Sequence, residues 1–210
     1  MQRCSLCHKP SILKWSTSTR DYFHCHHCDL VFVPKEQHLG PTEEKARYCL
    51  HDNTLENSGY VRMFTDKFPI LAAHWQDVVT VLDYGSGPGP VLVELLNREG
   101  YRAVGYDPYF APDTDLAGPY DAVISTEAFE HFSSPARELH RIVSSIRTGG
   151  YLAIMTMLRT DQVAFLDWWY MADPTHVAFY SSHTLSWIAE AYRLSIRYSN
   201  NHDFIIYQKD

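Results

Sequence analysis

The sequence predicts an α/β protein built on a parallel sheet and preceded by a small metal-stabilised module. From residue 78 onwards, short apolar runs alternate with stretches of helical spacing, which is typical of successive strand–helix–strand units. The first of these runs leads into a glycine-rich loop over residues 83–89. Upstream, four cysteines form two C-x-x-C pairs, a pattern typical of zinc sites.

Length and charge limit the classes of function. The 210 residues suffice for one α/β domain and a small appendage. A net charge of −7 argues against wrapping bare nucleic acid, because phosphate binding needs clustered lysine and arginine. The sequence contains no apolar run of membrane-spanning length and no basic-then-apolar leader. These features predict a cytoplasmic protein with no membrane partner.

The N-terminal cysteines Cys4, Cys7, Cys25 and Cys28 match a four-thiolate structural zinc site. Seventeen residues separate the two pairs, and each pair places two sulfurs on one tight turn. Residues 1–34 are therefore predicted to form a zinc ribbon, with most of its folding energy supplied by the ion. A histidine replacing one cysteine is the open alternative; the candidates are His8, His24, His26 and His27.

The elements follow in order along the chain. Residues 35–77 read as a linker and a helical lid, with a short helix from residue 42 and a longer one over 61–75 that Pro69 kinks. From 78 to 210 we expect strands near 79–84, 102–106, 120–125 and 150–156, and helices near 89–98, 134–147 and 182–192. Gly149-Gly150 is expected to stop the second of these helices. The last two strands, 193–198 and 204–209, are expected to form an antiparallel hairpin.

The glycine loop predicts a nucleoside-binding site. Glycines at 85, 87 and 89 follow Asp83, and glycine lets a backbone turn sharply and approach a ligand closely. The following helix offers free N–H donors at its start. Asp107 ends the next strand, where a carboxylate is placed to accept both ribose hydroxyls.

The pattern D-x-G-x-G-x-G over residues 83–89 resembles motif I of the class I S-adenosylmethionine-dependent methyltransferases. Residues 120–132, YDAVISTEAFEHF, resemble the fourth-strand motif of the same family. The resemblance implies a Rossmann-like seven-stranded sheet with a C-terminal antiparallel hairpin. Residues 110–119 depart from the family pattern. They stand where a third strand is expected, and this segment is short for a complete strand.

The resemblance also implies S-adenosylmethionine as cofactor. The residues it places at the cofactor are Asp83, Gly85, Gly87, Gly89, Asp107 and Glu127, with Asp83 meeting the methionine amine.

Methyl transfer needs an acceptor aligned with the methyl group and, for protonated acceptors, a base. His131 follows the fourth strand and His176 follows the fifth, so both are predicted catalytic residues, with His176 the preferred base. Polar groups amid aromatics predict a substrate pocket. The predicted substrate-binding residues are His51, Asn53, Trp168, Trp169, Tyr170, Asp173 and Thr175.

These observations favour an S-adenosylmethionine-dependent methyltransferase with a small-molecule acceptor and a structural zinc ion. Two alternatives stay open. The mildly basic ribbon is compatible with an RNA base methyltransferase that grips RNA. A non-catalytic zinc-ribbon adaptor would retain the fold without turnover.

Overall fold

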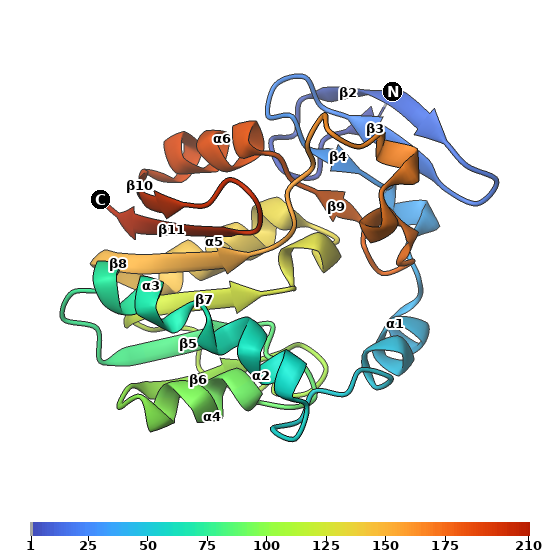
Figure 1. Cartoon of the computed structure of the whole chain (residues 1–210). Coiled ribbons are helices and arrows are strands. Elements are labelled where there is room, and N and C mark those ends of the chain that lie inside the picture. Colours follow the sequence, from blue (N-terminus) through green and yellow to red (C-terminus); the bar gives the residue numbers. More distant parts are fainter. Residues whose placement is uncertain (1) are drawn as a thin grey trace.

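The computed structural model describes residues 2–210, which form two sheets (Figure 1). The larger sheet has six strands in the order β10-β11-β8-β7-β5-β6. Strands β6, β5, β7 and β8 run parallel, whereas β11 is antiparallel to both β8 and β10. Their bounds are β5 Thr80–Tyr84, β6 Arg102–Tyr106, β7 Tyr120–Thr126, β8 Ile146–Met155, β10 Leu194–Ser199 and β11 Phe204–Lys209.

The sheet has six strands in the described residues, in place of the seven expected. The missing strand belongs beyond β6, where the chain forms only an isolated bridge between Asp107 and Ala111. Prolines at 108, 112 and 119 interrupt this segment. Proline has no N–H to donate to a ladder, so the segment cannot pair regularly along β6.

Helices cover both faces of the sheet (Figure 1). On one face α2 (Ser58–Thr65), α3 (Phe68–His74) and α4 (Val91–Arg98) pack over a cluster that includes Ala122 and Ile124 of β7. On the other face α5 (Pro135–Ser145) and α6 (Ser182–Tyr192) pack over a cluster that includes Val123. Alternate residues of a strand thus enter two different cores, as a sheet buried on both faces requires.

Two predicted helix boundaries were wrong. The single helix expected over 61–75 is two helices, α2 and α3, and Pro69 lies in the first turn of α3, where no intrahelical N–H is needed. The helix α5 ends at Ser145, so Gly149-Gly150 lies within β8. Gly149 has a φ of +75°, and the pairing of β8 with β7 shifts register here, as in a bulge.

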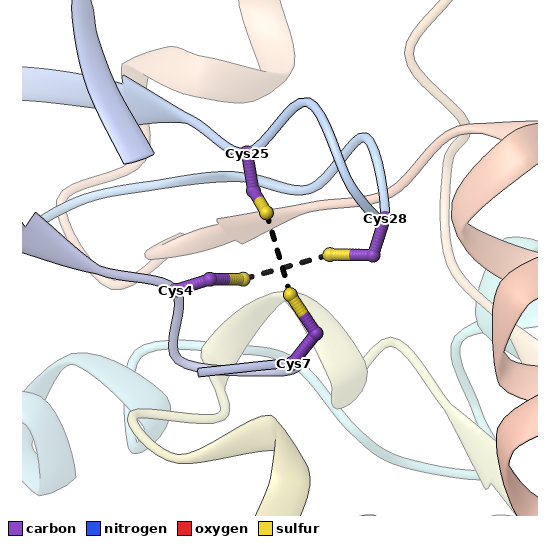
Figure 2. Close-up of side chains that lie close together, drawn as sticks. All are labelled: Cys4, Cys7, Cys25 and Cys28. Atoms are coloured by element: carbon purple, nitrogen blue, oxygen red, sulfur yellow. Dashed lines mark hydrogen bonds between the residues drawn. The ribbon is translucent and has the colours of Figure 1, made fainter. Parts of the chain in front are cut away.

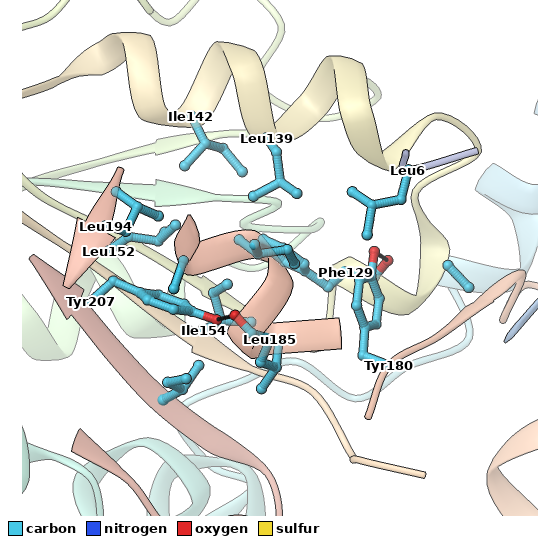
Figure 3. Packing of buried hydrophobic residues seen from close by; sticks show 14 of the residues in the cluster. Leu6, Phe129, Leu139, Ile142, Leu152, Ile154, Tyr180, Leu185, Leu194 and Tyr207 are labelled. Carbon is cyan, nitrogen blue, oxygen red and sulfur yellow. Dashed lines mark hydrogen bonds between the residues drawn. The ribbon is translucent and has the colours of Figure 1, made fainter. Parts of the chain in front are cut away.

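The smaller sheet joins the N-terminal module to the rest of the chain. Its strands are β1 (Gln2–Arg3), β2 (Pro10–Ser16), β3 (Asp21–His24), β4 (Val31–Phe32) and β9 (Ala178–Phe179), in that order. The β4–β9 pairing crosses the domain boundary expected at residue 34. Leu6 also enters the core cluster that contains Phe129 and Tyr180 (Figure 3). The module is therefore packed into the main core.

The helix α1 (Pro41–Tyr48) follows β4 and precedes β5 in sequence, and it lies to one side of the large sheet (Figure 1). Short 3-10 turns cover Lys35–Gln37, Phe129–His131, Phe165–Asp167 and Trp169–Ala172. In the described part of the chain, no helix combines the length and apolar character needed to cross a bilayer.

Asp121 links three strands of the large sheet through its carboxylate. Its Oδ2 accepts the backbone N–H of Val79 at 3.0 Å and of Thr80 at 2.7 Å, and its Oδ1 accepts Arg147 Nε–H at 2.7 Å. Burial raises the pKa of Asp121, but these bonds outweigh burial and hold the pKa below its usual range.

We expect Asp121→Ala to lower the free energy of unfolding at pH 7 by about 1–3 kcal/mol. Asp121→Asn keeps an oxygen for Thr80 and should lose less. Because the folded-state pKa is lowered, the contribution is complete above the unfolded value of about 3.9 and is lost as the pH falls toward the folded value. Urea unfolding at pH 7 and near pH 3 measures both effects. Equal stability of wild type and Asp121→Ala at pH 7 would contradict the prediction.

Candidate functional site

A cavity of about 770 Å³ opens at the carboxyl ends of β5, β6 and β7. This is the edge where ligands bind in open parallel sheets. The predicted site residues that line it are His51, Asn53, Asp83, Gly85, Gly87, Asp107, Glu127, His131 and His176.

The glycine loop forms the floor of the cavity. Gly85 has a φ of +89°, and a Cβ there would lie 2.6 Å from the Ala128 Cβ, so both backbone shape and space require glycine. The N–H groups of Gly85 and Ser86 donate to the Tyr106 carbonyl at 2.8 and 3.0 Å. The loop is thereby tied to the end of β6.

Asp107 organises the two loops beside it. Its Oδ2 accepts the Gly87 N–H at 3.0 Å, and its Oδ1 accepts the N–H groups of Tyr109 at 2.8 Å and Phe110 at 3.2 Å. Carboxylate oxygens each carry two lone pairs, so Asp107 retains accepting capacity toward a hydroxyl in the cavity.

Asp83 is a buried carboxylate with an unused oxygen. Its side chain is 2 % exposed and its Oδ1 has no hydrogen-bond partner. Burial, with a smaller effect of the Asp107 carboxylate, raises the pKa of Asp83 to about 7. Such a group at a cavity wall fits a ligand amine or ammonium, which would supply the missing donor and a positive charge.

Glu127 lies in a strained backbone position on the cavity wall. Its φ is +48°, uncommon for a residue with a Cβ, and its N–H donates to the Met155 carbonyl at 2.8 Å. Enclosure by the cavity and the neighbouring Glu130 carboxylate raise the pKa of Glu127. Glu127 therefore combines an uncommon backbone conformation with a place in the cavity lining.

The two predicted catalytic histidines lie side by side, with ring centroids 4.8 Å apart. His131 Nδ1 lies 3.1 Å from the Thr175 carbonyl oxygen, and His176 Nδ1 lies 2.6 Å from the Tyr170 carbonyl oxygen. Burial lowers the pKa of His131 to about 4 and, together with the neighbouring His131, lowers the pKa of His176. Both rings are therefore neutral near pH 7.

Six of the residues predicted for cofactor or substrate do not line the cavity: Gly89, Trp168, Trp169, Tyr170, Asp173 and Thr175. Trp169 is 69 % exposed, and Tyr170 is buried with its hydroxyl 3.3 Å from Thr156 Oγ1. Asp173 pairs with Arg47 of α1 at 2.9 Å and accepts the Thr175 hydroxyl. This segment therefore supplies the backbone carbonyls that lie beside the two histidine rings.

The stretch of chain after α1 covers the glycine loop. His51 and Asn53 line the cavity, and Gly89 lies against Asn53. A Cβ on Gly89 would lie 2.1 Å from the Asn53 carbonyl oxygen. The absence of a side chain at residue 89 therefore allows the covering segment to approach.

Sequence reasoning assigned no role to several lining residues. Glu44 accepts the Tyr48 hydroxyl at 2.8 Å and the Tyr109 hydroxyl at 2.5 Å, which joins α1 to the loop after β6. The signal available was the i, i+4 spacing of Glu44 and Tyr48 on one helix face. Glu130 was visible beside His131 in the fourth-strand motif, yet it was not selected.

The four N-terminal cysteines converge (Figure 2). Their sulfurs lie within 4.8 Å of one another, with Cys4–Cys28 at 3.5 Å and Cys7–Cys25 at 3.3 Å. Sulfurs about 2.3 Å from one zinc ion at tetrahedral angles lie roughly 3.8 Å apart, so the set fits that ion with small adjustments.

Ionisation of all four cysteines needs a cation among them. Burial raises the pKa of Cys7 to about 12, and the hydrogen bond with Cys4 followed by burial raises that of Cys28, whereas the hydrogen bond with Cys28 lowers the pKa of Cys4 to about 5. Cys7 and Cys28 would therefore become thiolates only with a positive ion beside them.

Residues 43–198 match a family model described as "Methyltransferase domain". The match covers well over half of the chain, so the chain belongs to this methyltransferase family, which uses S-adenosylmethionine. The match begins within α1 and includes the glycine loop and both histidines.

Solved structures share the fold at low sequence identity. An O-methyltransferase family protein from Burkholderia thailandensis is 18 % identical with a TM-score of 0.50, over 80 % of this chain and 63 % of that one. A SAM-dependent methyltransferase from Archaeoglobus fulgidus is 19 % identical with a TM-score of 0.52, over 71 % and 94 %. DesVI from Streptomyces venezuelae is 11 % identical with a TM-score of 0.54, over 82 % and 99 %.

The chain thus spans less than two thirds of the Burkholderia thailandensis protein. No curated protein matches the chain.

The approach of the covering segment to Gly89 predicts that Gly89→Ala weakens cofactor binding. The added methyl would displace the backbone at Asn53 and open the cavity. Calorimetric titration with S-adenosylmethionine measures the loss. Gly59→Ala is the matched control, because a Cβ there meets only Asn57 Oδ1 at 3.5 Å. Unchanged affinity in Gly89→Ala would contradict a covering role for this segment.

The cysteine cluster predicts that Cys25→Ser abolishes a stoichiometric zinc ion and lowers the thermal midpoint. Structural zinc contributes about 10–16 kcal/mol in small zinc-binding peptides, so the loss should be large. Metal content by mass spectrometry and thermal unfolding measure both effects. Cys49→Ser is the control, since Cys49 is exposed and lies outside the cluster. Full zinc content in Cys25→Ser would exclude the assignment.

Proposed function

We propose that the protein is an S-adenosylmethionine-dependent methyltransferase that acts on a small-molecule acceptor and carries a structural zinc ion. The unpartnered Oδ1 of Asp83 at the wall of the 770 Å³ cavity is the observation that best supports the cofactor site. The family match supports methyl transfer, and the size of the cavity supports a small acceptor.

The cofactor, when bound, supplies a methyl group on a sulfonium sulfur. Asp83 would accept hydrogen bonds from the methionine amine, and Asp107 would accept from the ribose hydroxyls. The glycine loop lets the backbone approach the nucleoside, since no side chain intervenes at Gly85 or Gly87. Glu127 at the cavity mouth completes the predicted cofactor set.

His131 and His176 would activate the acceptor. A carbonyl oxygen can only accept, so each Nδ1 beside a backbone carbonyl carries the hydrogen, and each Nε2 keeps its lone pair. Both residues line the cavity, so these lone pairs are available to an acceptor hydroxyl or amine. His51 and Asn53, on the covering segment, would contact the acceptor from the opposite side.

The RNA alternative receives less support. The ribbon is packed into the main core through β9 and Leu6, and the chain has a net charge of −7. Retention on an RNA column at low salt would favour that alternative.

We expect the wild-type protein to bind S-adenosylmethionine and Asp107→Ala to bind it about 10- to 150-fold more weakly, the equivalent of a lost charged hydrogen bond. Calorimetry on zinc-replete protein provides the test. No binding of the cofactor or of its demethylated product by folded wild-type protein would refute the proposal and favour an adaptor.

With an acceptor identified, His176→Ala should lower kcat about 100- to 10,000-fold while the cofactor affinity stays near wild type. His183→Ala is the control, because His183 is an exposed histidine of α6 that does not line the cavity. A normal kcat in His176→Ala would remove His176 from the reaction.

A further inference from the structure

Three potential metal ligands meet at the inner wall of the cavity. One carboxylate oxygen of Glu130 and one nitrogen each from His131 and His176 lie within 4.8 Å of one another. All three residues line the cavity. They come from two segments, the turn after β7 and the segment before β9, which the Val177 N–H joins by donating to the Glu130 carbonyl at 2.7 Å.

The histidines are oriented as metal ligands usually are. Metal-binding imidazoles commonly donate their second N–H to a carbonyl or carboxylate, which fixes the ring and its tautomer. Here the Thr175 and Tyr170 carbonyls accept from the two Nδ1–H groups, at 3.1 and 2.6 Å. Each Nε2 therefore offers a lone pair.

Glu130 supplies the second, independent observation. Its side chain is 0 % exposed; Oε2 accepts the Thr156 hydroxyl at 2.8 Å, whereas Oε1 has no partner. This Oε1 lies 3.8 Å from His131 Nε2, so it is directed at the histidine pair. A fully buried carboxylate oxygen without a donor is costly, and a cation would satisfy it.

The ligand atoms need to move inward to hold one ion. Ligand atoms about 2.1 Å from one ion at tetrahedral angles lie roughly 3.4 Å apart. The Glu130–His131 pair at 3.8 Å is about 0.4 Å wider than this, and any other pair is at most about 1.4 Å wider.

We propose that Glu130, His131 and His176 bind a divalent transition-metal ion such as Zn²⁺ or Fe²⁺, distinct from the ion of the cysteine cluster. Two imidazoles and one carboxylate form a donor set that suits these ions and leaves coordination positions open. The open positions face the cavity, because all three side chains line it. The ligand they would take is an oxygen of the acceptor.

This inference rests on the proposed methyl transfer and narrows its acceptor to a molecule with a metal-binding hydroxyl. A bound divalent ion lowers the pKa of such a hydroxyl, whose proton then leaves to solvent. The ion would thus take over the acceptor activation assigned above to the free imidazoles.

The test counts bound zinc on the full chain after chelation and equilibrium dialysis against Zn²⁺. We expect two ions per chain in wild type, one in Glu130→Gln, and two in the control His183→Ala. One ion in wild type, or two in Glu130→Gln, would overturn the inference. Retention of the cysteine-bound ion and an unchanged circular dichroism spectrum establish that Glu130→Gln is folded.

If Glu130→Gln does not fold, Thr156→Val decides the question. It preserves side-chain shape but removes the hydroxyl that holds Oε2, so affinity for the second ion should fall about 10- to 100-fold. Unchanged affinity would overturn the inference.

Calorimetry with S-adenosylmethionine on the same samples separates the two proposals. Cofactor binding with a single zinc ion leaves the proposed function standing without this site. Two ions without cofactor binding would support the site and refute the proposed function.

Discussion

The pairing of β4 with β9 is the constraint on which the site depends. It joins Val31 to Phe179 and Phe32 to Ala178, two residues beyond His176. The Val33 N–H extends the contact by donating to the Val177 carbonyl at 2.9 Å, and Arg20 donates to the backbone carbonyls of Asp173 and His176. The backbone around His176 is thus held by the N-terminal module.

This arrangement gives the cysteine cluster a role beyond local folding. Cys4, Cys25 and Cys28 belong to the same buried cluster as Phe129 and Tyr180, which flank the histidine-bearing segments. Because a sheet this small cannot bury much surface alone, an ion held by these cysteines would stabilise the module together with the main core. Disturbance of the cysteines should therefore reach the histidines through β4 and β9.

The sequence was informative where the local residue types fix the backbone conformation. The glycine pattern over 83–89 and the strand ends at Asp83 and Asp107 predicted the cavity floor, since backbone shape there depends on local residue type. The two C-x-x-C pairs predicted the cysteine cluster for the same reason. The parallel strands followed from alternating strand and helix patterns, although the prolines of residues 108–119 removed the seventh strand.

Non-local contacts account for what the sequence did not predict. The aromatic segment from Trp168 to Tyr170 was predicted to bind substrate from its composition. Composition does not show which way the side chains point. In the structure its backbone accepts from His176 while Trp169 faces solvent. The role of Gly89 likewise depends on Asn53, which lies far away in sequence. Strand β9 has only two residues and pairs with a strand about 147 positions earlier, so no periodicity reveals it.

Two kinds of feature in the cavity wall lower the stability of the folded chain when no ligand is bound. In the described residues, the buried carboxylate oxygens without a partner are Asp83 Oδ1 and Glu130 Oε1, and both belong to residues lining this cavity. Glu127, which also lines the cavity, adds backbone strain. Such features persist when the surrounding core holds them and bound ligands offset their cost. Asp83 suits the cofactor amine, and Glu130 suits a cation beside the histidines. One wall of the cavity would therefore bind both the methyl donor and the ion that holds the acceptor.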